Sequence, residues 1–314
     1  MLNTLDDIDL PLPDRRAGKV RVSWELPGAR RLFVTTDRLS AFDRIVAKVP
    51  NKGQVLNQLA AWWFQQTADI VANHLGSLPD PNALIATAAT PLPVEVVVRS
   101  AITGVTGTSL WKRYADGERT IYGHRLPEGL HKNDLLPAAL ITPTTKAEGG
   151  THDEPLTVAD VVDKGYVDQK LWSQVCTAAL AVFEHGQSIA ASAGLILADT
   201  KYEFGLRSDG TLLLIDEMHT PDSSRYWEAS TYEARVSRGE EPESLDKEDV
   251  RRALVDAGYV GDGEPPALTP DVWERTSSRY VRAYERLTGT AFVPGAQPIE
   301  DRLRANLRDA GVLS

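Results

Sequence analysis

The strongest constraint on the fold of this chain is a segment in which two apolar runs flank a tight-turn signal. Residues 195–217 read LILADTKYEFGLRSDGTLLLIDE. Runs of aliphatic and aromatic residues bounded by turn-forming residues are typical of strands, and Asp-Gly is a favoured two-residue hairpin turn. The pattern predicts strands over Leu195–Leu206 and Thr211–Ile215. They are joined at Asp209-Gly210, so that Ser208 lies opposite Thr211.

The hairpin also predicts a cluster of charged side chains on one face. Asp199, Lys201 and Glu203 are spaced by two residues, so they share one face of an extended strand. The predicted turn places Glu203 opposite Asp216, where like charges roughly 4.5–5.5 Å apart repel each other. Mg²⁺ commonly binds one or two carboxylates together with phosphate oxygens. Glu203 and Asp216 are therefore the predicted Mg²⁺ ligands, and Lys201 is expected to reach a phosphate or an acyl oxygen.

This interpretation of the hairpin leaves one alternative open. An exposed hairpin with a solvated stripe of charges would show the same spacing in sequence. The apolar runs LILA and LLLI argue for partial burial instead. The register is the critical assumption, because a change of one residue in the loop would turn Asp216 to the other face of the sheet.

Two arginines are candidate ligands for a phosphate or a carboxylate. Arg99 ends the apolar strand predicted over Val94–Arg99 and precedes a loop that ends at Ser109. Arginine can bind either anion through two parallel hydrogen bonds. Arg225 follows the hairpin, directly after the hydroxyl of Ser224. The chain contains no Gly-x-x-x-x-Gly-Lys-[Ser/Thr] motif, so a phosphate-binding loop of that type is excluded.

Several further charged residues allow two interpretations each. Lys146 and Asp153 lie in the cation- and carboxylate-rich segments 144–148 and 152–154, which could equally form a solvated loop. Lys19 and Lys52 each adjoin a glycine and, taken singly, are expected at the surface. The histidines show no spacing typical of a zinc site, and His219 is expected at most as a neutral donor near the metal.

Composition excludes several classes of protein. The formal net charge is −10, whereas nucleic-acid-binding domains usually carry a basic excess. The single cysteine, Cys176, permits neither an intrachain disulfide nor a cysteine-built metal site. No run approaches ~18 apolar residues, and the acidic leader does not resemble a signal peptide. We therefore expect no nucleic-acid or membrane partner and a cytoplasmic location.

The remaining pattern predicts an α+β fold of two lobes with a helical C-terminal extension. We expect a β-rich lobe over residues 1–93, to which the family resemblance described below assigns ATP binding, and a second α+β lobe with the metal hairpin over residues 94–314. The supporting elements are strands over Gly18–Glu25 and Arg31–Thr36, helices over Gln54–Leu75 and Val167–Ala193, and helical patterns after Tyr232. Pro79–Pro93 reads as a connection between lobes, and Asp116–Gly150 as an irregular region.

The motifs resemble one known family. LILADTKYEFG (195–205) and IDEMHTPDSSRYW (215–227) resemble the two diagnostic segments of phosphoribosylaminoimidazole-succinocarboxamide synthase, or SAICAR synthetase. TPTTKAEGGTHDE, RLSAFDRIVAKVPNKG and EVVVRSAITG resemble further blocks of this family, and the length is similar to its longer, fungal-like form. The resemblance implies a first lobe related to those of protein kinases and ATP-grasp enzymes. It also implies an ATP- and Mg²⁺-dependent ligase that joins L-aspartate to a carboxylated aminoimidazole ribonucleotide in purine biosynthesis.

The resemblance also implies roles for individual residues. Lys19 and Lys146, with Glu203 and Asp216, would bind ATP and Mg²⁺. The ribonucleotide phosphate would be bound by Arg99, Ser109, Ser224 and Arg225, with Lys247 as a further candidate. Asp153 would face the imidazole substrate, and Asp199 and Lys201 the reacting centre. One departure is Val22, which stands where relatives usually carry an acidic residue, and Thr108 could take the role of Ser109 because the loop is longer than in many relatives.

This activity would proceed by phosphorylation of the substrate carboxylate, followed by attack of the aspartate amine on the acyl phosphate. Asp199 or Asp153 would act as the base in the second step, and the sequence does not distinguish them. The competing interpretations are a small-molecule kinase and a nucleotide-sensing module without turnover. The expected partners are small molecules, with the protein a monomer or a small homo-oligomer.

Overall fold

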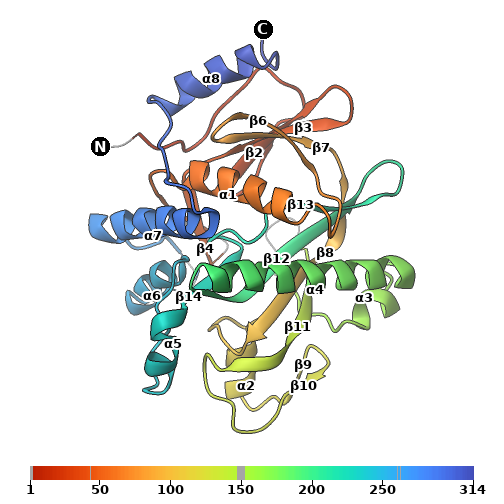
Figure 1. Cartoon of the computed structure of the whole chain (residues 1–314), viewed down its shortest axis with the longest axis vertical. Coiled ribbons are helices and arrows are strands. Elements are labelled where there is room, and N and C mark those ends of the chain that lie inside the picture. The colour runs from red at the N-terminus through yellow and green to blue at the C-terminus, as the bar shows by residue number, and fades with distance from the viewer. Residues whose placement is uncertain (1–2, 43, 147–152, 260, 262) are drawn as a thin grey trace.

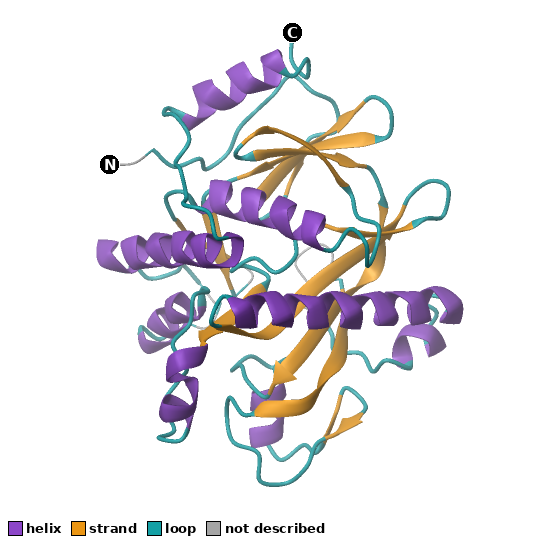
Figure 2. Cartoon of the chain, in the orientation of Figure 1, coloured by secondary structure: helices purple, strands orange, loops and turns teal. Residues whose placement is uncertain are grey.

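The computed structural model describes residues 3–42, 44–146, 153–259, 261 and 263–314. Their strands form two large antiparallel sheets, and helices lie between the sheets and around them (Figures 1 and 2). The α+β class predicted from the sequence is confirmed. Among the described residues, no helix combines the length and apolar character needed to cross a membrane.

The first sheet is built from the N-terminal part of the chain. Its strand order is β1 (Arg16–Ala17), β2 (Arg21–Leu26), β3 (Arg30–Thr35), β7 (Ala83–Thr87) and β6 (Leu75–Asp80). A separate ribbon pairs β4 (Arg38–Ala41) with β5 (Arg44–Lys48). The segment Pro79–Pro93 is not a simple connection as predicted, because it contains β7 and the start of the next strand.

The second sheet carries the charged hairpin at its centre. Its strand order is β11 (Leu135–Thr145), β8 (Thr90–Ala101), β12 (Leu195–Leu206) and β13 (Leu212–Ile215), and β14 (Ser224–Glu228) also pairs with β12. The bounds predicted for β12 are confirmed. The prediction of an irregular region up to residue 150 is wrong, since β11 occupies eleven of its residues. Pro137 and Pro143 obscured this strand, but an edge strand tolerates proline.

One helix lies between the two sheets, and another covers the second sheet. Helix α1 (Lys52–Gln66) lies between them in Figure 1, and its Trp63 and Phe64 pack in the same core as Val96 of β8. The predicted helix over Gln54–Leu75 thus ends earlier than expected. Helix α4 (Gln169–Ser192) covers the second sheet and ends before Gly194, whose φ of +71° suits a helix terminus.

The remaining helices complete both lobes. They are α2 (Leu110–Ala115), α3 (Asp160–Asp163), α5 (Ala229–Val236), α6 (Glu248–Asp256), α7 (Pro270–Thr288) and α8 (Ile299–Asp309), and the short strands β9 (Thr120–Ile121) and β10 (His124–Arg125) form a hairpin. Helix α8 packs on the first sheet, where Leu303 and Leu307 share a core with Trp24 (Figure 1). A division into residues 1–93 and 94–314 would assign this helix to the other lobe and would cut β8.

Candidate active site

The register of the β12–β13 hairpin differs from the prediction by one residue. The loop has three residues, because the N–H of Arg207 donates to the carbonyl of Thr211 at 2.9 Å. Gly210 follows the turn with a φ of +84°, as a three-residue loop requires. Glu203 therefore lies opposite Ile215, and the predicted pairing of Glu203 with Asp216 in the ladder is wrong.

On the other side of β12, Glu203 lies opposite Glu95 of β8. Lys201 Nζ is 2.7 Å from Glu95 Oε1 and 2.9 Å from Glu203 Oε1, and Lys146 forms an ion pair with Glu203. Burial raises the pKa of Glu95. Burial also opposes ionisation of Glu203, but Lys201 and Lys146 bring its pKa down to about 2. Two carboxylates thus face each other, as the sequence predicted for Glu203. The partner of Glu203 is Glu95 and not Asp216, and Lys201 lies between the two groups.

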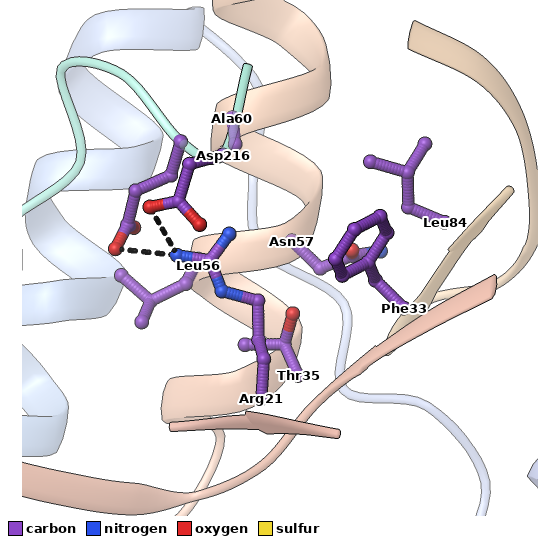
Figure 3. Close-up of a pocket in the computed structure, with 9 residues that line it drawn as sticks. Arg21, Phe33, Thr35, Leu56, Asn57, Ala60, Leu84 and Asp216 are labelled. Carbon is purple, nitrogen blue, oxygen red and sulfur yellow. Dashed lines mark hydrogen bonds and ion pairs between the residues drawn. The ribbon is translucent and has the colours of Figure 1, made fainter. Parts of the chain in front are cut away.

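Asp216 lies just beyond the ladder and is held from the other lobe. It has a φ of +70°, an uncommon value for a residue other than glycine. Arg21 Nη2 is 2.9 Å from both Asp216 Oδ2 and Glu217 Oε1, as the dashed lines in Figure 3 show. Burial raises the pKa of Asp216, Arg21 opposes this shift, and Glu203 adds to it. Glu203 and Asp216 therefore interact electrostatically although they are not paired in the sheet.

Figure 3 also shows what surrounds this inter-lobe ion pair. The side chain of Arg21 extends from the first sheet toward Asp216, and Leu56 and Ala60 of α1 lie beside it. Phe33 of β3 lies on the other side of the same small cavity. Neither Arg21 nor Glu95 was predicted to be a site residue. A charged residue within the apolar run VEVVVR was the available signal for Glu95.

The donor set fits Mg²⁺. Glu203 and Asp216 supply hard carboxylate oxygens, the donors that this ion prefers. No group of three or more potential metal ligands occurs among the described residues. Two carboxylates are nevertheless enough for an ion that completes its coordination with water and phosphate oxygens.

A second charged group occupies the other end of the same strand face. Arg99 of β8 and Arg225 of β14 are both paired with Asp199 of β12 in the sheet. Arg99 Nη1 is 3.5 Å from Asp199 Oδ2, and Arg225 forms an ion pair with the same oxygen. Arg99 is also held by Thr142, whose Oγ1 accepts from its Nε at 2.9 Å. Arg225 Nε is also 3.6 Å from Glu248 Oε2, so the two arginines share Asp199 while Arg225 has a second carboxylate partner.

The two serines predicted to bind the ribonucleotide phosphate, Ser109 and Ser224, lie in different places. Ser109 starts α2, where its Oγ donates to the carbonyl of Thr106 at 2.7 Å. A Cβ atom added at Gly104 would lie 2.5 Å from Ser109 Cβ and 3.4 Å from Arg225 Nη2, so this loop approaches Arg225 closely. Ser224 does not join the group, because its hydroxyl donates to Thr200 on the opposite face of the sheet.

Two lysines lie beside the carboxylate of Asp222, for which no role was predicted. Lys52 Nζ is 2.7 Å from Asp222 Oδ2 and fully buried, so the expectation of a surface lysine is wrong. Lys247 Nζ is 3.7 Å from Asp222 Oδ1, and burial lowers its pKa to about 8. The hydroxyl of Tyr280 donates to Asp222 Oδ1 at 2.5 Å. This cluster joins α1, α6 and α7 beside the loop that precedes β14.

Three remaining predictions concern Lys19, Asp153 and His219. Lys19 is exposed just before β2. Asp153 is near enough to Glu95 to affect its pKa, while residues 147–152 of the same segment lie outside the described residues. His219 is fully buried against Tyr202 and Gly186, and burial lowers its pKa to about 3. It is neutral as expected, but it packs on the face of β12 opposite the charged row.

Comparisons with family models, with known sequences and with solved structures all identify the same family. The sequence model of the family described as SAICAR synthetase matches residues 14–266. A phosphoribosylaminoimidazole-succinocarboxamide synthase of Legionella pneumophila (strain Lens) is 45% identical over 309 residues, which cover 97% of each chain. A chloroplastic enzyme of the same name from Arabidopsis thaliana is 45% identical over 302 residues, 95% of this chain and 73% of the relative. A Saccharomyces cerevisiae SAICAR synthase solved with SAICAR matches with a TM-score of 0.79 and 30% identity, covering 92% of this chain and 100% of the other.

Proposed function

Because the chain belongs to the SAICAR synthetase family, we propose that the charged row along β12 is the active site of its ATP-dependent ligase activity. The chain joins L-aspartate to 5-amino-1-(5-phospho-D-ribosyl)imidazole-4-carboxylate, which yields the succinocarboxamide, ADP and phosphate in purine biosynthesis.

One observation carries the assignment. The groups along β12 run from Asp199 with its two arginines, through Lys201, to Glu203. At roughly 3.3 Å per residue, the first and last of these positions are about 13 Å apart. The ribonucleotide has a phosphate at one end and a carboxylate at the other. Its phosphate would be bound by Arg99 and Arg225, and its carboxylate would then lie near Lys201.

The nucleotide would be bound at the other end of the row. Glu203 and Asp216 would hold Mg²⁺, and Lys146 and Lys19 would face the phosphates of ATP. When bound, Mg²⁺ would neutralise charge on the phosphoryl group during transfer. Arg21 supports this arrangement, because it connects the nucleotide-binding sheet directly to Asp216.

The chemistry would occur at Lys201, between these two ends. The γ-phosphoryl group passes to a carboxylate oxygen of the ribonucleotide, and ADP leaves. The aspartate amine then attacks the carbonyl carbon, the carbon–oxygen bond to phosphate breaks, and a base takes the amine proton. Lys201 would hold the reacting oxygen and balance its charge. Asp199 or Asp153 would act as this base.

Three other residues were predicted to bind the ribonucleotide phosphate. Ser109 and Lys247 are further candidates for the ribonucleotide phosphate, whereas the hydroxyl of Ser224 points to the other face of the sheet. We also propose that the protein is cytoplasmic and forms a monomer or a small homo-oligomer.

A coupled assay of ADP release, with each substrate omitted in turn, tests the assignment. We expect ADP only when ATP, the ribonucleotide and L-aspartate are all present at steady state. ADP production that does not require aspartate would identify a small-molecule kinase instead. Nucleotide binding without any turnover would identify a sensing module.

A further inference from the structure

Tyr122 occupies a backbone conformation that its side chain does not favour. It is the first residue of the two-residue turn between β9 and β10, since Ile121 pairs with His124. Its φ is +55°, and the next residue, Gly123, has a φ of +85°. Such turns usually carry asparagine or aspartate before the glycine. A bulky residue with positive φ is strained, and such strain is often retained at functional sites.

The side chain of Tyr122 is directed at the loop before α2. Its ring is buried, at 3% exposure for the residue, among Ile102, Leu110 and Ile121. Its hydroxyl donates to the carbonyl of Thr108 at 2.7 Å. Burial raises the pKa of Tyr122, so the hydroxyl keeps its proton and remains a donor.

The carbonyl of Thr108 is also an acceptor for Arg99. Arg99 Nη2 donates to it at 3.3 Å, while the Nε of the same side chain donates to Thr142. The guanidinium of Arg113 lies over the ring of Tyr122 at 5.1 Å from its centre. One carbonyl therefore links the loop, Tyr122 and the arginine that we assign to the ribonucleotide phosphate.

We propose that Tyr122 is a positioning residue for the ribonucleotide site: its hydroxyl fixes the carbonyl of Thr108, which in turn orients Arg99. This inference rests on the proposed role of Arg99 in phosphate binding. In this role Tyr122 acts through the direction of one guanidinium and the conformation of the loop at 103–109.

The test compares Tyr122→Phe with Tyr114→Phe. The two tyrosines belong to the same buried cluster, and each donates one hydrogen bond to a backbone carbonyl, that of Pro127 in the case of Tyr114. In Tyr122→Phe we expect the KM for the ribonucleotide to rise severalfold, up to about tenfold, the range that one hydrogen bond supports. The KM for ATP and the kcat should remain unchanged. In Tyr114→Phe all three constants should remain unchanged, with a similar change in Tm in both variants.

A double-mutant cycle with Arg99→Ala completes the experiment. If Tyr122 acts through Arg99, the double variant should have the same ribonucleotide KM as Arg99→Ala alone. Additive effects, or a Tyr122→Phe enzyme that behaves like Tyr114→Phe, would overturn the inference. An unchanged ribonucleotide KM in Arg99→Ala would instead refute the proposed role of Arg99, so the two failures are distinguishable.

Discussion

Glu203 and Glu95 lie directly opposite each other on neighbouring strands, and the ammonium group of Lys201 is within hydrogen-bonding distance of both. The proposed metal ligand Glu203 is therefore part of a charge network in which removal of any member leaves a buried charge with fewer partners. This network makes the roles of the individual residues measurable, because each single substitution has a distinct expected effect.

Loss of either proposed metal ligand should abolish turnover. In Glu203→Gln and Asp216→Asn, one of the two carboxylates proposed to bind Mg²⁺ becomes a neutral amide of similar shape. Nucleotide affinity, measured by titration with and without Mg²⁺, should then be nearly independent of the metal. Asp209→Asn is the matched control, because Asp209 lies at the tip of the same hairpin and pairs with Arg207. Near-normal activity in Glu203→Gln or Asp216→Asn would contradict the proposed metal site.

Arg225→Ala should weaken binding of the ribonucleotide selectively. A hydrogen bond to a charged group contributes roughly 1.5–3 kcal/mol, which corresponds to about one to two decades in KM for this substrate. The KM for ATP should change far less. Arg282→Ala provides the comparison, since Arg282 is exposed and pairs with Glu228 at the far end of β14. An equal rise in both KM values for Arg225→Ala would assign this arginine to the fold or to the nucleotide.

The order of the chemical steps can be tested with labelled substrate. If the carboxylate is phosphorylated first, one of its oxygens must leave in inorganic phosphate when the amide forms. Ribonucleotide labelled with ¹⁸O in the carboxylate should therefore deliver one label to phosphate for each amide made. Mass spectrometry of the released phosphate measures this ratio. Unlabelled phosphate would exclude activation of the carboxylate by ATP.

Lys201→Met should depress kcat with only a modest change in either KM. Lys201 lies between the two proposed ends of the site, where it can stabilise charge that develops during phosphoryl transfer. An interaction made mainly in the transition state affects kcat rather than ground-state binding. Steady-state kinetics with ATP and the ribonucleotide varied separately give both constants. A variant in which only the KM values rise would assign Lys201 to substrate binding.

Two buried histidines should make the protein sensitive to mild acid. Burial lowers the pKa of His74 and of His219 to about 3, whereas an unfolded histidine titrates near 6.5. Between these values the unfolded chain binds more protons, so stability is lost as the pH falls from about 6.5 toward 3. At pH 5 each histidine should destabilise the folded state by on the order of 2 kcal/mol relative to pH 7.5.

The matched variants for this effect are His74→Phe and His131→Gln. The ring of His74 contacts Phe33 and Phe64, so phenylalanine keeps the packing, whereas His131 is exposed. Urea unfolding at pH 7.5 and pH 5 should show a smaller loss of stability in His74→Phe than in the wild type. His131→Gln should match the wild type. The same loss in all three proteins would mean that His74 does not contribute.

The local pattern in the sequence was enough to predict β12 but not its register. Leu195–Leu206 has the alternation of a strand and ends at a turn signal, and its bounds are confirmed. An Asp-Gly pair, however, fits both a two-residue and a three-residue loop. In the three-residue loop that forms, the side chain of Asp209 bonds to Arg207 and to the N–H of Thr211.

Partners distant in sequence could not be predicted in this way. Arg21 is separated from Asp216 by 195 residues, and Lys201 from Glu95 by 106. No periodicity connects such residues: Arg21 meets Asp216 because the two lobes pack together, and Lys201 meets Glu95 because β12 pairs with β8 within one sheet. Lys52 is a further example, because its burial depends on Asp222 and not on its neighbours in the chain.

The packing of α8 on the first sheet has a consequence for synthesis of the protein on the ribosome. The core that contains Trp24 and Val34 also contains Ile299, Leu303 and Leu307. The N-terminal sheet, whose last strand β7 ends at Thr87, therefore cannot bury its full apolar surface until α8 (Ile299–Asp309) has been translated. Domains usually fold as units in the order of their synthesis. Here the first strands to emerge must wait for α8. Until α8 has been synthesised, their apolar face stays exposed to chaperones.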